Sequence, residues 1–505
     1  MSHALRSSTV DGIIRRSAHT FRDRVAVVFG EREWTYAALD DAVTRAASRL
    51  LGLGLAKGDR VAAYGKNSDA YLIGFLACAR AGLVHVPLNY NLTGAELSYL
   101  IGQSGSRAIL VDPALEAALD GVDLDVREQL EHRIPLRDNA GSVIETATEG
   151  VVAAIEADVT DTDLCQFLYT SGTTSRPKAA MMSHRALVHE YLSCLVGLDL
   201  TPEDAPLHVM PLYHSAQMHV FLMPWLAIGA TNTLLEVPDA AEILRRMEQD
   251  GHRAFFAAPT LWVALTNHPD FETRDLSGLR KAYYGASIMP VPIIKRLESK
   301  MPGLGFYNCF GQSEIAPLAT ILRPEEHADR PDSAGRPCLF VEARVIDAEG
   351  NDVPVGETGE IVYRSPQLCD GYWNNPEATD EAFAGGWFHS GDLVRMDEEG
   401  YVFVVDRIKD VINTGGVMVA SREIEDALYT HPAVAEVAVI GVPDEKWIEA
   451  VAAFVVRKGD VTEDELAAHA RNTLAGFKIP KRITFVDELP RNASGKILKR
   501  ELRGA

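Results

Sequence analysis

A run of small, hydroxyl-bearing and basic residues is the segment of this chain best suited to chemistry. It spans residues 169–178, reads Tyr-Thr-Ser-Gly-Thr-Thr-Ser-Arg-Pro-Lys and follows a predicted strand at 165–168. Backbone N–H groups and hydroxyls in such a run form a concave nest that suits a cluster of anionic oxygens. Lys178 adds a positive charge, although the spacing is not that of the Gly-x4-Gly-Lys-Ser/Thr phosphate loop. The run predicts a phosphate-binding loop; composition alone also leaves open an ordinary surface loop.

Further polar motifs follow this run in order along the chain. They read Gly-Ala-Ser at 285–287, Tyr-Asn-Cys-Phe-Gly-Gln-Ser-Glu at 307–314, Gly-Glu-Thr-Gly-Glu at 356–360, Gly-Tyr-Trp at 371–373, Ser-Gly-Asp at 390–392 and Pro-Arg-Asn-Ala-Ser-Gly-Lys at 490–496. Together with the first run they resemble the motifs of the adenylate-forming superfamily, which contains acyl-CoA synthetases, peptide-synthetase adenylation domains and firefly luciferase. The agreement extends over nearly all 505 residues, so chance is a negligible explanation.

The resemblance implies an ATP site in which the first run cradles the phosphates and the next two motifs flank the adenine. The implied cofactor-binding residues are Thr170, Ser171, Gly172, Thr173, Thr174, Lys178, Gly285, Ala286, Ser287, Asn308, Cys309, Phe310, Gly311, Gln312, Ser313, Asp392, Arg407 and Gly416. Ser313 would meet a phosphate, whereas Asp392 and Arg407 would reach the ribose, whose two hydroxyls one carboxylate can bind. Glu314 is implied to help hold Mg²⁺, an ion that prefers hard oxygen ligands.

The implied reaction is the attack of a carboxylate on the α-phosphorus of ATP, with pyrophosphate as the leaving group. Because negative charge gathers at the reaction centre, catalysis is mostly positioning and charge stabilisation. The resemblance assigns this role to Lys496, and it places His214, in Pro-Leu-Tyr-His-Ser at 211–215, near the acid. A simpler interpretation stays open for each of these groups: a solvated lysine, a surface acid, a turn aspartate or a packed histidine.

A second step, transfer of the acyl group to CoA, is implied by two residues near the C-terminus. Lys409 lies at the family's hinge, and Gly416 matches a glycine over which the pantetheine arm passes, where a side chain would block the tunnel. Residues 417–421, Val-Met-Val-Ala-Ser, lack the polar, aromatic and proline character that many family members have there. The leading hypothesis is therefore an AMP-forming acid–CoA ligase that uses ATP, Mg²⁺ and CoA. The alternative is an adenylating enzyme that passes its product to a carrier protein or an amine, or activates nitrite for diazotisation.

Composition excludes several other classes of protein. The chain carries 49 Lys and Arg against 71 Asp and Glu, a formal charge of −22, which argues against nucleic acid as the main partner. Hydrophobic residues make up 47%, as in globular domains, which excludes a disordered or fibrous chain. The six cysteines show no metal spacing and are expected to be reduced thiols in a cytoplasmic protein. We expect neither a signal peptide nor an integral membrane segment; the oligomeric state, monomer or homodimer, stays open.

The alternation of helical and strand-like segments predicts an α/β fold with largely parallel sheets. Helices are expected at 36–51, 68–81, 421–429 and 464–475, and strands at 60–64, 84–88, 343–346, 360–363, 401–405, 434–442, 450–456 and 482–486. Residues 413–416 are read as a turn, and Ser421 as an N-cap. With the resemblance, this predicts a large N-terminal domain, residues 1–408, of α/β sheet subdomains plus a small β-barrel-like subdomain. Residues 409–505 would form a small, mobile α+β C-terminal domain that caps a cleft for ATP and the acid.

The acid itself is the least defined part of the prediction. Met218, Phe221, Leu222 and Met223 suggest an apolar, adaptable pocket for a fatty or aromatic acid, although the same residues suit a helix core equally well. No acidic residue within 213–226 suggests an anchor for an amino group, so an α-amino acid is disfavoured. A catalytically inactive nucleotide-binding relative and a luciferase-like oxygenase are weaker alternatives.

Overall fold

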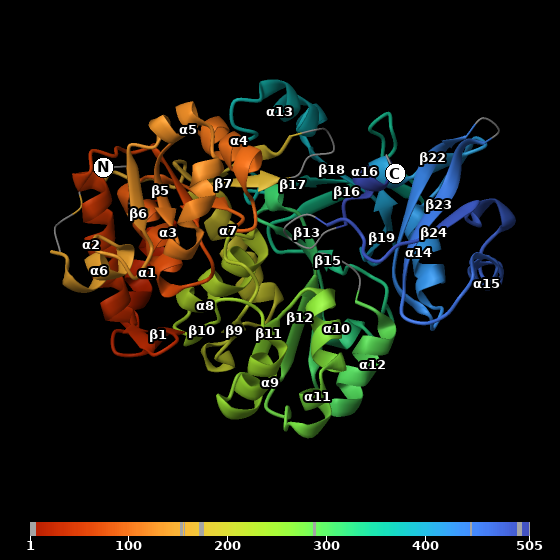
Figure 1. Ribbon diagram of the computed structural model, residues 1–505, viewed down its shortest axis with the longest axis horizontal. Helices are drawn as coiled ribbons and strands as arrows, with labels where there is room; N and C mark the ends of the chain where they lie inside the picture. Colours follow the sequence, from red (N-terminus) through yellow and green to blue (C-terminus); the bar gives the residue numbers. More distant parts are fainter. Residues whose placement is uncertain are drawn as a thin grey trace. The chain divides into compact units, whose positions relative to one another are not determined.

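The computed structural model describes residues 7–151, 155, 157–170, 176–285, 289–444, 447–491 and 497–503 (Figure 1). The chain divides into two compact units. The first comprises residues 1–343 and 363–388, and the second residues 344–362 and 389–505.

The first unit contains a six-stranded sheet in the order β6-β5-β3-β4-β7-β8. Its strands are β3 (Arg60–Tyr64), β4 (Val84–Leu88), β5 (Ser106–Val111), β6 (His132–Pro135), β7 (Leu164–Thr170) and β8 (Lys178–Ser183). All neighbours are parallel except β7 and β8, which form an antiparallel hairpin. Parallel strands require crossover connections, and α3 (Asp69–Ala81), α4 (Gly94–Ser104), α5 (Leu124–Gln129) and α6 (Val143–Glu149) lie in them. Helix α2 (Tyr36–Gly52) precedes β3 and packs on α3 and α6.

A nine-stranded sheet in the same unit has the order β15-β14-β13-β12-β11-β9-β10-β1-β2. Its strands are β1 (Val25–Phe29), β2 (Arg32–Thr35), β9 (Leu207–His208), β10 (Asn232–Leu234), β11 (Ala254–Phe256), β12 (Lys281–Gly285), β13 (Gly305–Gly311), β14 (Leu318–Leu322) and β15 (Arg336–Pro337). The central strands are parallel, and β2, β14 and β15 are antiparallel additions. The other helices of this unit are α1 (Val10–Thr20), α7 (His184–Gly197), α8 (Met223–Ala227), α9 (Ala240–Gln249), α10 (Pro259–Asn267), α11 (Pro269–Thr273), α12 (Val291–Lys300) and α13 (Pro376–Ala382).

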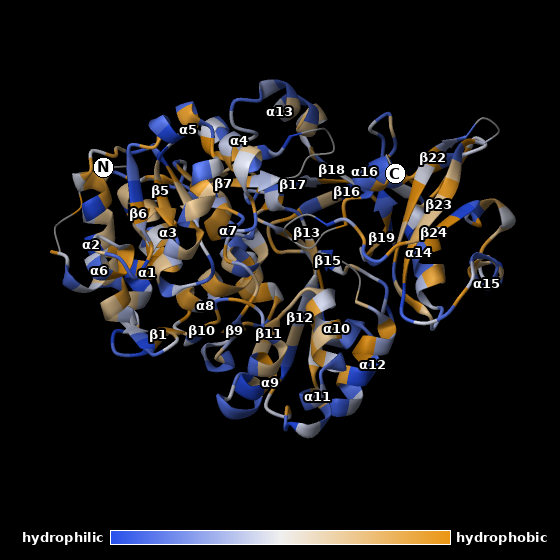
Figure 2. Ribbon diagram, viewed as in Figure 1, coloured by the Kyte–Doolittle hydropathy of each residue, from blue (hydrophilic) through white to orange (hydrophobic). Residues whose placement is uncertain are grey.

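Helix α3 lies between these two sheets. It contacts β3 and β4 of one sheet and β1 of the other, and all its residues are buried. A helix without a polar face is stable only in such a position, and α3 is mostly hydrophobic in Figure 2, whereas α9 carries an outer hydrophilic face. The hydroxyl of Ser68 caps the helix by accepting a hydrogen bond from the backbone N–H of Tyr71 (3.1 Å). The six- and nine-stranded sheets thus share one buried layer.

The second unit contains a four-stranded sheet in the order β16-β17-β18-β19, the small β unit that the sequence predicts. These strands are β16 (Glu342–Ile346), β17 (Thr358–Arg364), β18 (Phe388–Met396) and β19 (Val402–Arg407). A second sheet has the order β21-β20-β23-β22, with β24 beside β23. It consists of β20 (Ile412–Thr414), β21 (Val417–Val419), β22 (Val434–Asp444), β23 (Ile448–Arg457) and β24 (Arg482–Phe485), and it packs with α14 (Ser421–Tyr429), α15 (Glu463–Ala470) and α16 (Lys499–Leu502).

Three expectations about this second unit need correction. Ser421 is the first residue of α14 and not its N-cap, because its hydroxyl and backbone N–H both donate to Asp406 (2.9 and 2.6 Å). The helix expected at 464–475 ends at Ala470. Asn413 and Thr414 belong to β20, so the turn contains only Gly415 and Gly416.

In the first unit, the two strands expected at 60–64 and 84–88 have the predicted bounds.

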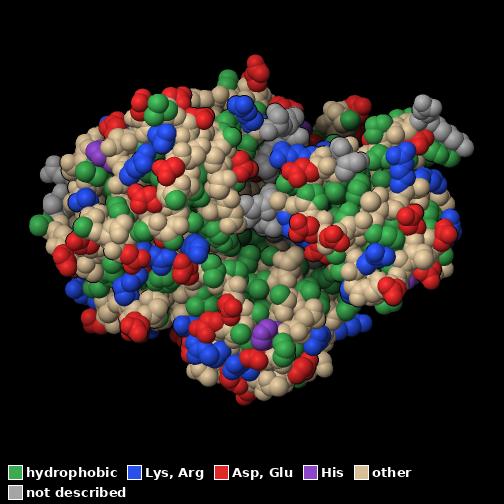
Figure 3. Space-filling view, viewed as in Figure 1, with side chains coloured by type: hydrophobic (Ala, Val, Ile, Leu, Met, Phe, Trp, Pro, Cys, Tyr) green, Lys and Arg blue, Asp and Glu red, His purple; other side chains and the backbone are tan. Residues whose placement is uncertain are grey.

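The surface and the cysteines add two further observations. Acidic and basic side chains are interspersed on the face shown in Figure 3. All six cysteines are free thiols, and five of them are buried. Within the described ranges, no helix is long and apolar enough to cross a membrane.

Candidate active site

The predicted phosphate loop connects the two strands of the β7–β8 hairpin. Thr170 and Lys178 are the last paired residues of these strands, so both ends of the loop are held next to each other. The neighbouring helix α4 supports the hairpin, because the hydroxyl of Tyr99 donates to the carbonyl of Pro177 (2.9 Å). Four predicted phosphate contacts lie in 171–175, outside the described residues: Ser171, Gly172, Thr173 and Thr174.

Tyr372 connects the phosphate-loop lysine to the predicted metal ligand. The ammonium nitrogen of Lys178 lies 5.1 Å from the centroid of the Tyr372 ring, and the Tyr372 hydroxyl donates to Glu314 Oε1 (3.0 Å). Burial above all, and the Glu314 carboxylate next, raise the pKa of Tyr372, so the phenol stays protonated and remains a hydrogen-bond donor. Lysine over an aromatic ring is a favourable arrangement. Residues 178, 372 and 314 therefore form one connected polar chain.

Backbone pairing explains why these distant residues meet. The segment around Tyr372 runs along β8, where Met181 N donates to Gly371 O and Trp373 N to Ala179 O (2.9 Å each). The same segment reaches the next motif, because Cys369 N donates to the carbonyl of Glu314 (2.8 Å). These backbone hydrogen bonds hold the Gly-Tyr-Trp motif at 371–373 between β8 and Glu314.

Ser313 and Glu314 lie in a single 3₁₀ turn, η5 (Ser313–Ile315), directly after β13. Glu314 is only 8% exposed. The hydroxyl oxygens of Ser313 and Ser215 are 3.3 Å apart, which brings the loop that carries His214 to this turn. His214 Nδ1 accepts a hydrogen bond from Ala216 N (3.3 Å).

A buried asparagine, absent from the sequence-based assignments, holds the loop that carries His214. Asn67 Nδ2 donates to the carbonyl of Met210 (3.0 Å), and Asn67 Oδ1 accepts from Leu212 N (2.7 Å). Nothing local to Asn67 in the sequence reveals this contact, since its partners lie more than 140 positions away. The structure thereby adds a supporting residue to the sequence-based set.

The predicted adenine motifs end adjacent parallel strands. β12 and β13 place Gly285 beside Cys309, and a Cβ at position 285 would lie 2.3 Å from the Cys309 carbonyl oxygen. Gly311 has a φ of +155°, and a Cβ there would lie 2.0 Å from the Pro317 carbonyl oxygen. The carboxyl ends of parallel strands are the usual ligand site of open α/β sheets.

The remaining residues of these motifs divide into described and undescribed ones. Asn308, Phe310 and Gln312 are half-buried, and Asn308 Nδ2 donates to the carbonyl of Ser333 (3.0 Å). Burial raises the pKa of the Cys309 thiol, which therefore stays protonated. Ala286 and Ser287 lie outside the described residues.

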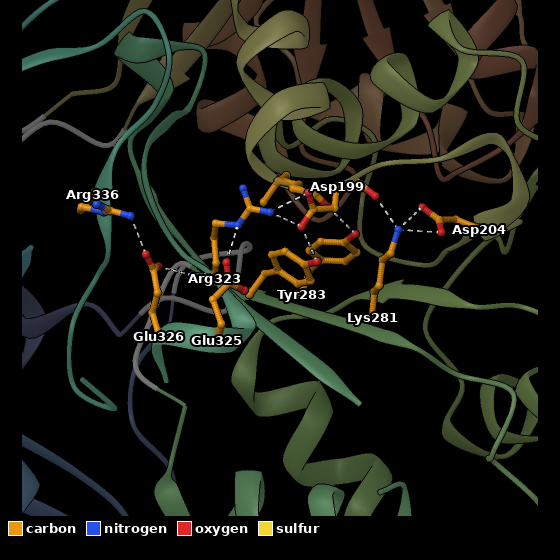
Figure 4. A network of polar contacts seen from close by, with 10 residues as sticks. Asp199, Asp204, Lys281, Tyr283, Arg323, Glu325, Glu326 and Arg336 are labelled. Carbon is orange, nitrogen blue, oxygen red and sulfur yellow. Dashed lines mark hydrogen bonds and ion pairs between the residues drawn. The ribbon is translucent and has the colours of Figure 1, made fainter. Parts of the chain in front are cut away.

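A network of charges fixes the same two strands at positions before their carboxyl ends (Figure 4). Asp199 accepts hydrogen bonds from Arg323 (2.7 Å) and from the hydroxyl of Tyr307 in β13 (2.9 Å). Lys281 in β12 donates to Asp204 (2.8 Å). Paired and hydrogen-bonded charges of this kind hold neighbouring elements in register.

In the second unit, the ribose candidates Asp392 and Arg407 face each other across β18 and β19. Their ion pair measures 2.8 Å, and Asp392 is almost fully buried. Lys409 is exposed, yet its partial desolvation lowers the pKa of its ammonium group; Asp410 opposes this effect and Arg407 reinforces it. Gly416, with a φ of +85°, follows in the β20–β21 turn.

The space around Gly416 is open in the described structure. A Cβ at this position would meet no atom of the described structure within 4 Å, so nothing crowds it here. The positive φ is the observed reason for a glycine at this point. Lys496, the predicted catalytic lysine, lies outside the described residues.

The residues proposed for an apolar acid pocket are core residues in the structure. Met218, Phe221, Leu222 and Met223 are all completely buried, and the Phe221 ring stacks on Phe256 with centroids 4.3 Å apart. Of the two interpretations that the sequence left open for these residues, the structure supports the core.

Glu314 is the metal candidate, and its surroundings fit Mg²⁺ bound together with a nucleotide. Within the described ranges, no group of three or more His, Cys, Asp or Glu side chains forms a metal cage. Mg²⁺ typically binds one or two carboxylates together with substrate phosphates. A single, oriented carboxylate beside the phosphate-loop hairpin is compatible with that mode.

Comparison with known proteins identifies the family of the chain. Residues 14–373 match the AMP-binding enzyme family, and residues 423–496 match the AMP-binding enzyme C-terminal domain. The chain is 38% identical to a feruloyl-CoA synthase of Amycolatopsis sp., covering 97% of both proteins. It is 33% identical to a long-chain-fatty-acid–CoA ligase of Escherichia coli O6:H1, covering 98% of this chain and 94% of that one.

Solved structures give the same result. ATP-bound MatB from Rhodopseudomonas palustris superposes with a TM-score of 0.90 at 31% identity, covering 98% of this chain and 99% of that one. The comparisons confirm the predicted fold class and the prediction of an AMP-forming acid–CoA ligase. Since the family match covers well over half of its residues, this chain belongs to the AMP-binding enzyme family.

Proposed function

We propose that this protein is an ATP-dependent ligase that converts a carboxylic acid, by way of an acyl-adenylate, into an acyl-CoA. The observation that carries the proposal is a series of side-chain contacts next to the β7–β8 hairpin, from Lys178 to the Tyr372 ring and from the Tyr372 hydroxyl to Glu314. It places a cation and an oriented carboxylate beside a loop rich in backbone donors. That combination suits a triphosphate with its metal ion.

In the first half-reaction, a carboxylate oxygen bonds to the α-phosphorus and the α–β phosphoanhydride bond breaks. Thr170, the loop residues 171–174 and Lys178 hold the phosphates in this proposal, and Ser313 donates to one of them. Lys496 balances the charge that develops at the α-phosphate. His214 lies beside the reacting carboxylate, a role supported by the contact between Ser215 and Ser313.

Mg²⁺ belongs to the proposed site through Glu314. When bound, it supplies charge neutralisation for the leaving pyrophosphate. The protein's own contribution is the orientation of the carboxylate by Tyr372, whose hydroxyl donates to Oε1.

The adenosine moiety is assigned to two groups of residues. The adenine lies against Gly285 and the segments 286–287 and 308–312, whose glycines allow close backbone approach. Asp392 accepts from the ribose hydroxyls, with Arg407 as its partner.

In the second half-reaction, the CoA thiol bonds to the acyl carbon and AMP leaves. Gly416 is proposed to lie along the pantetheine arm, since the space around its Cα is open. Lys409 is proposed as the hinge between a domain of residues 1–408 and one of residues 409–505. Both roles are supported by position in the family pattern.

A different acceptor is the second candidate, and one feature favours it. Met418 is 64% exposed and its neighbour Val417 is also exposed, in strand β21, which follows Gly416. An apolar carrier surface fits such residues better than a polar ligand does.

The acid is proposed to be aromatic first and a fatty acid second. The feruloyl-CoA synthase relative is more similar to this chain than the fatty-acid ligase relative, at 38% against 33% identity.

The test is pyrophosphate release with ATP, Mg²⁺ and a panel of hydroxycinnamic, arylacetic, benzoic and fatty acids, each with and without CoA. Mass analysis identifies the product. An acyl-CoA that forms only with CoA supports the ligase. Pyrophosphate release that CoA leaves unchanged favours the alternative acceptor, and no release with any acid contradicts the proposal.

A further inference from the structure

A buried polar cluster connects helix α7 to the turn that carries Ser313 and Glu314. It consists of Glu190 and Ser193 on α7 and of Gln367 from the segment that leads to Tyr372. Glu190 and Gln367 are both 0% exposed. No sequence motif of the chain includes either residue.

Gln367 is the centre of the cluster. Its Nε2 donates to Glu190 Oε2 (2.6 Å) and lies within hydrogen-bond distance of the carbonyls of Leu318 (3.0 Å) and Ile315 (3.3 Å). Its Oε1 accepts from the Ser193 hydroxyl (2.6 Å). The other Glu190 oxygen, Oε1, accepts from Leu318 N (3.1 Å). The cluster thus holds the backbone that follows Glu314 at three points: the carbonyls of Ile315 and Leu318 and the N–H of Leu318.

The same cluster also holds the other side of the predicted metal ligand. Gln367 lies two residues before Cys369, whose N–H donates to the Glu314 carbonyl, and five before Tyr372, whose hydroxyl donates to the Glu314 side chain. Main chain and carboxylate of Glu314 are therefore oriented by two segments that meet at Gln367.

No cationic side chain pairs with the Glu190 carboxyl group in the part of the chain that the structure describes. Burial raises its pKa well above the ordinary value, although the Leu318 N–H acts in the opposite direction. A buried carboxyl group costs more free energy than an apolar side chain of the same volume would. Packing alone does not explain a buried carboxyl group at position 190, whereas its hydrogen bonds to Leu318 N and Gln367 Nε2 do.

We propose that Glu190 and Gln367 are positioning residues that aim Glu314 at the metal and Ser313 at the phosphates. This inference rests on the proposed function, in which Glu314 binds Mg²⁺. Outer hydrogen-bond partners of metal ligands commonly change metal affinity roughly 10–100-fold when they are removed.

The test compares two variants that keep side-chain volume. Gln367→Met removes the donors to Glu190, Ile315 and Leu318. Glu190→Gln presents an amide to two donors. Half-saturating Mg²⁺ is measured for ATP binding by calorimetry and for pyrophosphate release. Both values should rise roughly tenfold, saturating Mg²⁺ should restore the rate, and the KM for the acid should stay unchanged.

Asn232→Leu is the matched control. Asn232 is also completely buried, and its Nδ2 donates to the carbonyls of Ala26 (3.1 Å) and Ala230 (3.0 Å), away from the turn. The Asn232→Leu substitution should lower Tm without changing the half-saturating Mg²⁺ concentration. An unchanged Mg²⁺ curve in Gln367→Met and Glu190→Gln, or an equal shift in Asn232→Leu, would overturn the inference.

Glu314→Gln distinguishes failure of the positioning role from failure of the proposed metal site. If this variant shifts the Mg²⁺ curve and the other two do not, the positioning role is wrong and the proposed function stands. If wild-type protein binds ATP and releases pyrophosphate equally with and without Mg²⁺, the Mg²⁺ role of Glu314 and this inference both fail, whereas the ligase function fails only if no acid supports pyrophosphate release.

Discussion

Arg407 Nε lies 2.8 Å from Asp392 Oδ1, and the two residues are direct cross-strand partners in β18 and β19. The pairing turns a nearly buried carboxylate into an acceptor of fixed direction. Ser390 supports it from the same strand, because the Ser390 hydroxyl accepts from Asp392 N (3.0 Å). Strand register, rather than loop chemistry, therefore determines where the proposed ribose ligand points.

Asp392→Asn should raise the KM for ATP and leave the KM for the acid unchanged. The amide keeps one acceptor but loses the charge, and hydrogen bonds to charged groups contribute about 1.5–3 kcal/mol, or roughly tenfold or more in KM. Steady-state kinetics with varied ATP measures this. Asp352→Asn, which removes the exposed ion pair with Arg344, is the control and should change neither constant.

Lys496→Ala should abolish acyl-AMP formation while ATP still binds. The lysine is proposed to balance charge that appears only as the α-phosphate reacts, so its loss affects the rate and not ground-state binding. Single-turnover formation of the adenylate and calorimetric ATP binding measure the two effects separately. Arg500→Ala, an exposed cation nearby in sequence, should retain activity. Normal adenylate formation in Lys496→Ala would rule out the mechanism.

Tyr372→Phe should raise the Mg²⁺ concentration that half-saturates the enzyme and leave the fold intact. The ring over Lys178 remains, but the hydrogen bond to Glu314 is lost. A loss of about 1 kcal/mol corresponds to a several-fold rise in half-saturating Mg²⁺. Tyr36→Phe, which removes a buried hydroxyl bonded to the Ala230 carbonyl, is the comparison and should leave the Mg²⁺ curve in place.

Gly416→Leu should spare adenylate formation and stop thioester formation. The substitution also forces a left-handed backbone on leucine, which costs about 1–2 kcal/mol. Gly400→Leu controls for this strain, since Gly400 has nearly the same φ, +83° against +85°, and equally open surroundings. Assays of each half-reaction should show a block only in Gly416→Leu. If both variants form acyl-CoA normally, Gly416 does not line the path of the acceptor.

Low pH should destabilise the folded protein, because two of its histidines are buried. Burial lowers the pKa of His85 and of His219 to about 3, from 6.5. Below pH 6.5 the unfolded chain therefore binds protons that the folded chain does not, and the free energy of unfolding falls as pH falls towards 3. Each histidine contributes roughly 1.4 kcal/mol per pH unit in this window.

The measurement is Tm between pH 7 and pH 5. His85→Gln should flatten the pH dependence by the share of one histidine, whatever its effect on Tm at pH 7. His19→Gln, a change at an exposed position, should leave the slope unaltered. An identical slope in wild type and His85→Gln would contradict the assignment.

Local patterns were sufficient to predict the segments whose chemistry is local. The strands at 60–64 and 84–88 have the expected bounds because short apolar runs between turn residues have few alternatives. Ser421 was assigned wrongly because its actual partner, Asp406, is a tertiary contact that replaces capping.

Contacts between distant segments account for the part of the site that the sequence did not predict. Tyr372 and Glu314 are 58 positions apart, and Gln367 and Glu190 are 177 apart. No periodicity or spacing rule relates such pairs, since the backbone pairing of a whole segment along β8 brings them together. The motif residues could be recognised, but the residues that orient them required the fold.

The hydrogen bond from Tyr372 to Glu314 has a consequence for ion selectivity. A carboxylate already restricted to one rotamer loses less conformational entropy on binding a cation, a saving of up to about 1.5–2 kcal/mol for glutamate. Such restriction favours a small ion that demands near-octahedral geometry over a larger ion that tolerates irregular coordination. Mn²⁺ should therefore substitute for Mg²⁺ better than Ca²⁺ in pyrophosphate release, and Tyr372→Phe should narrow that preference.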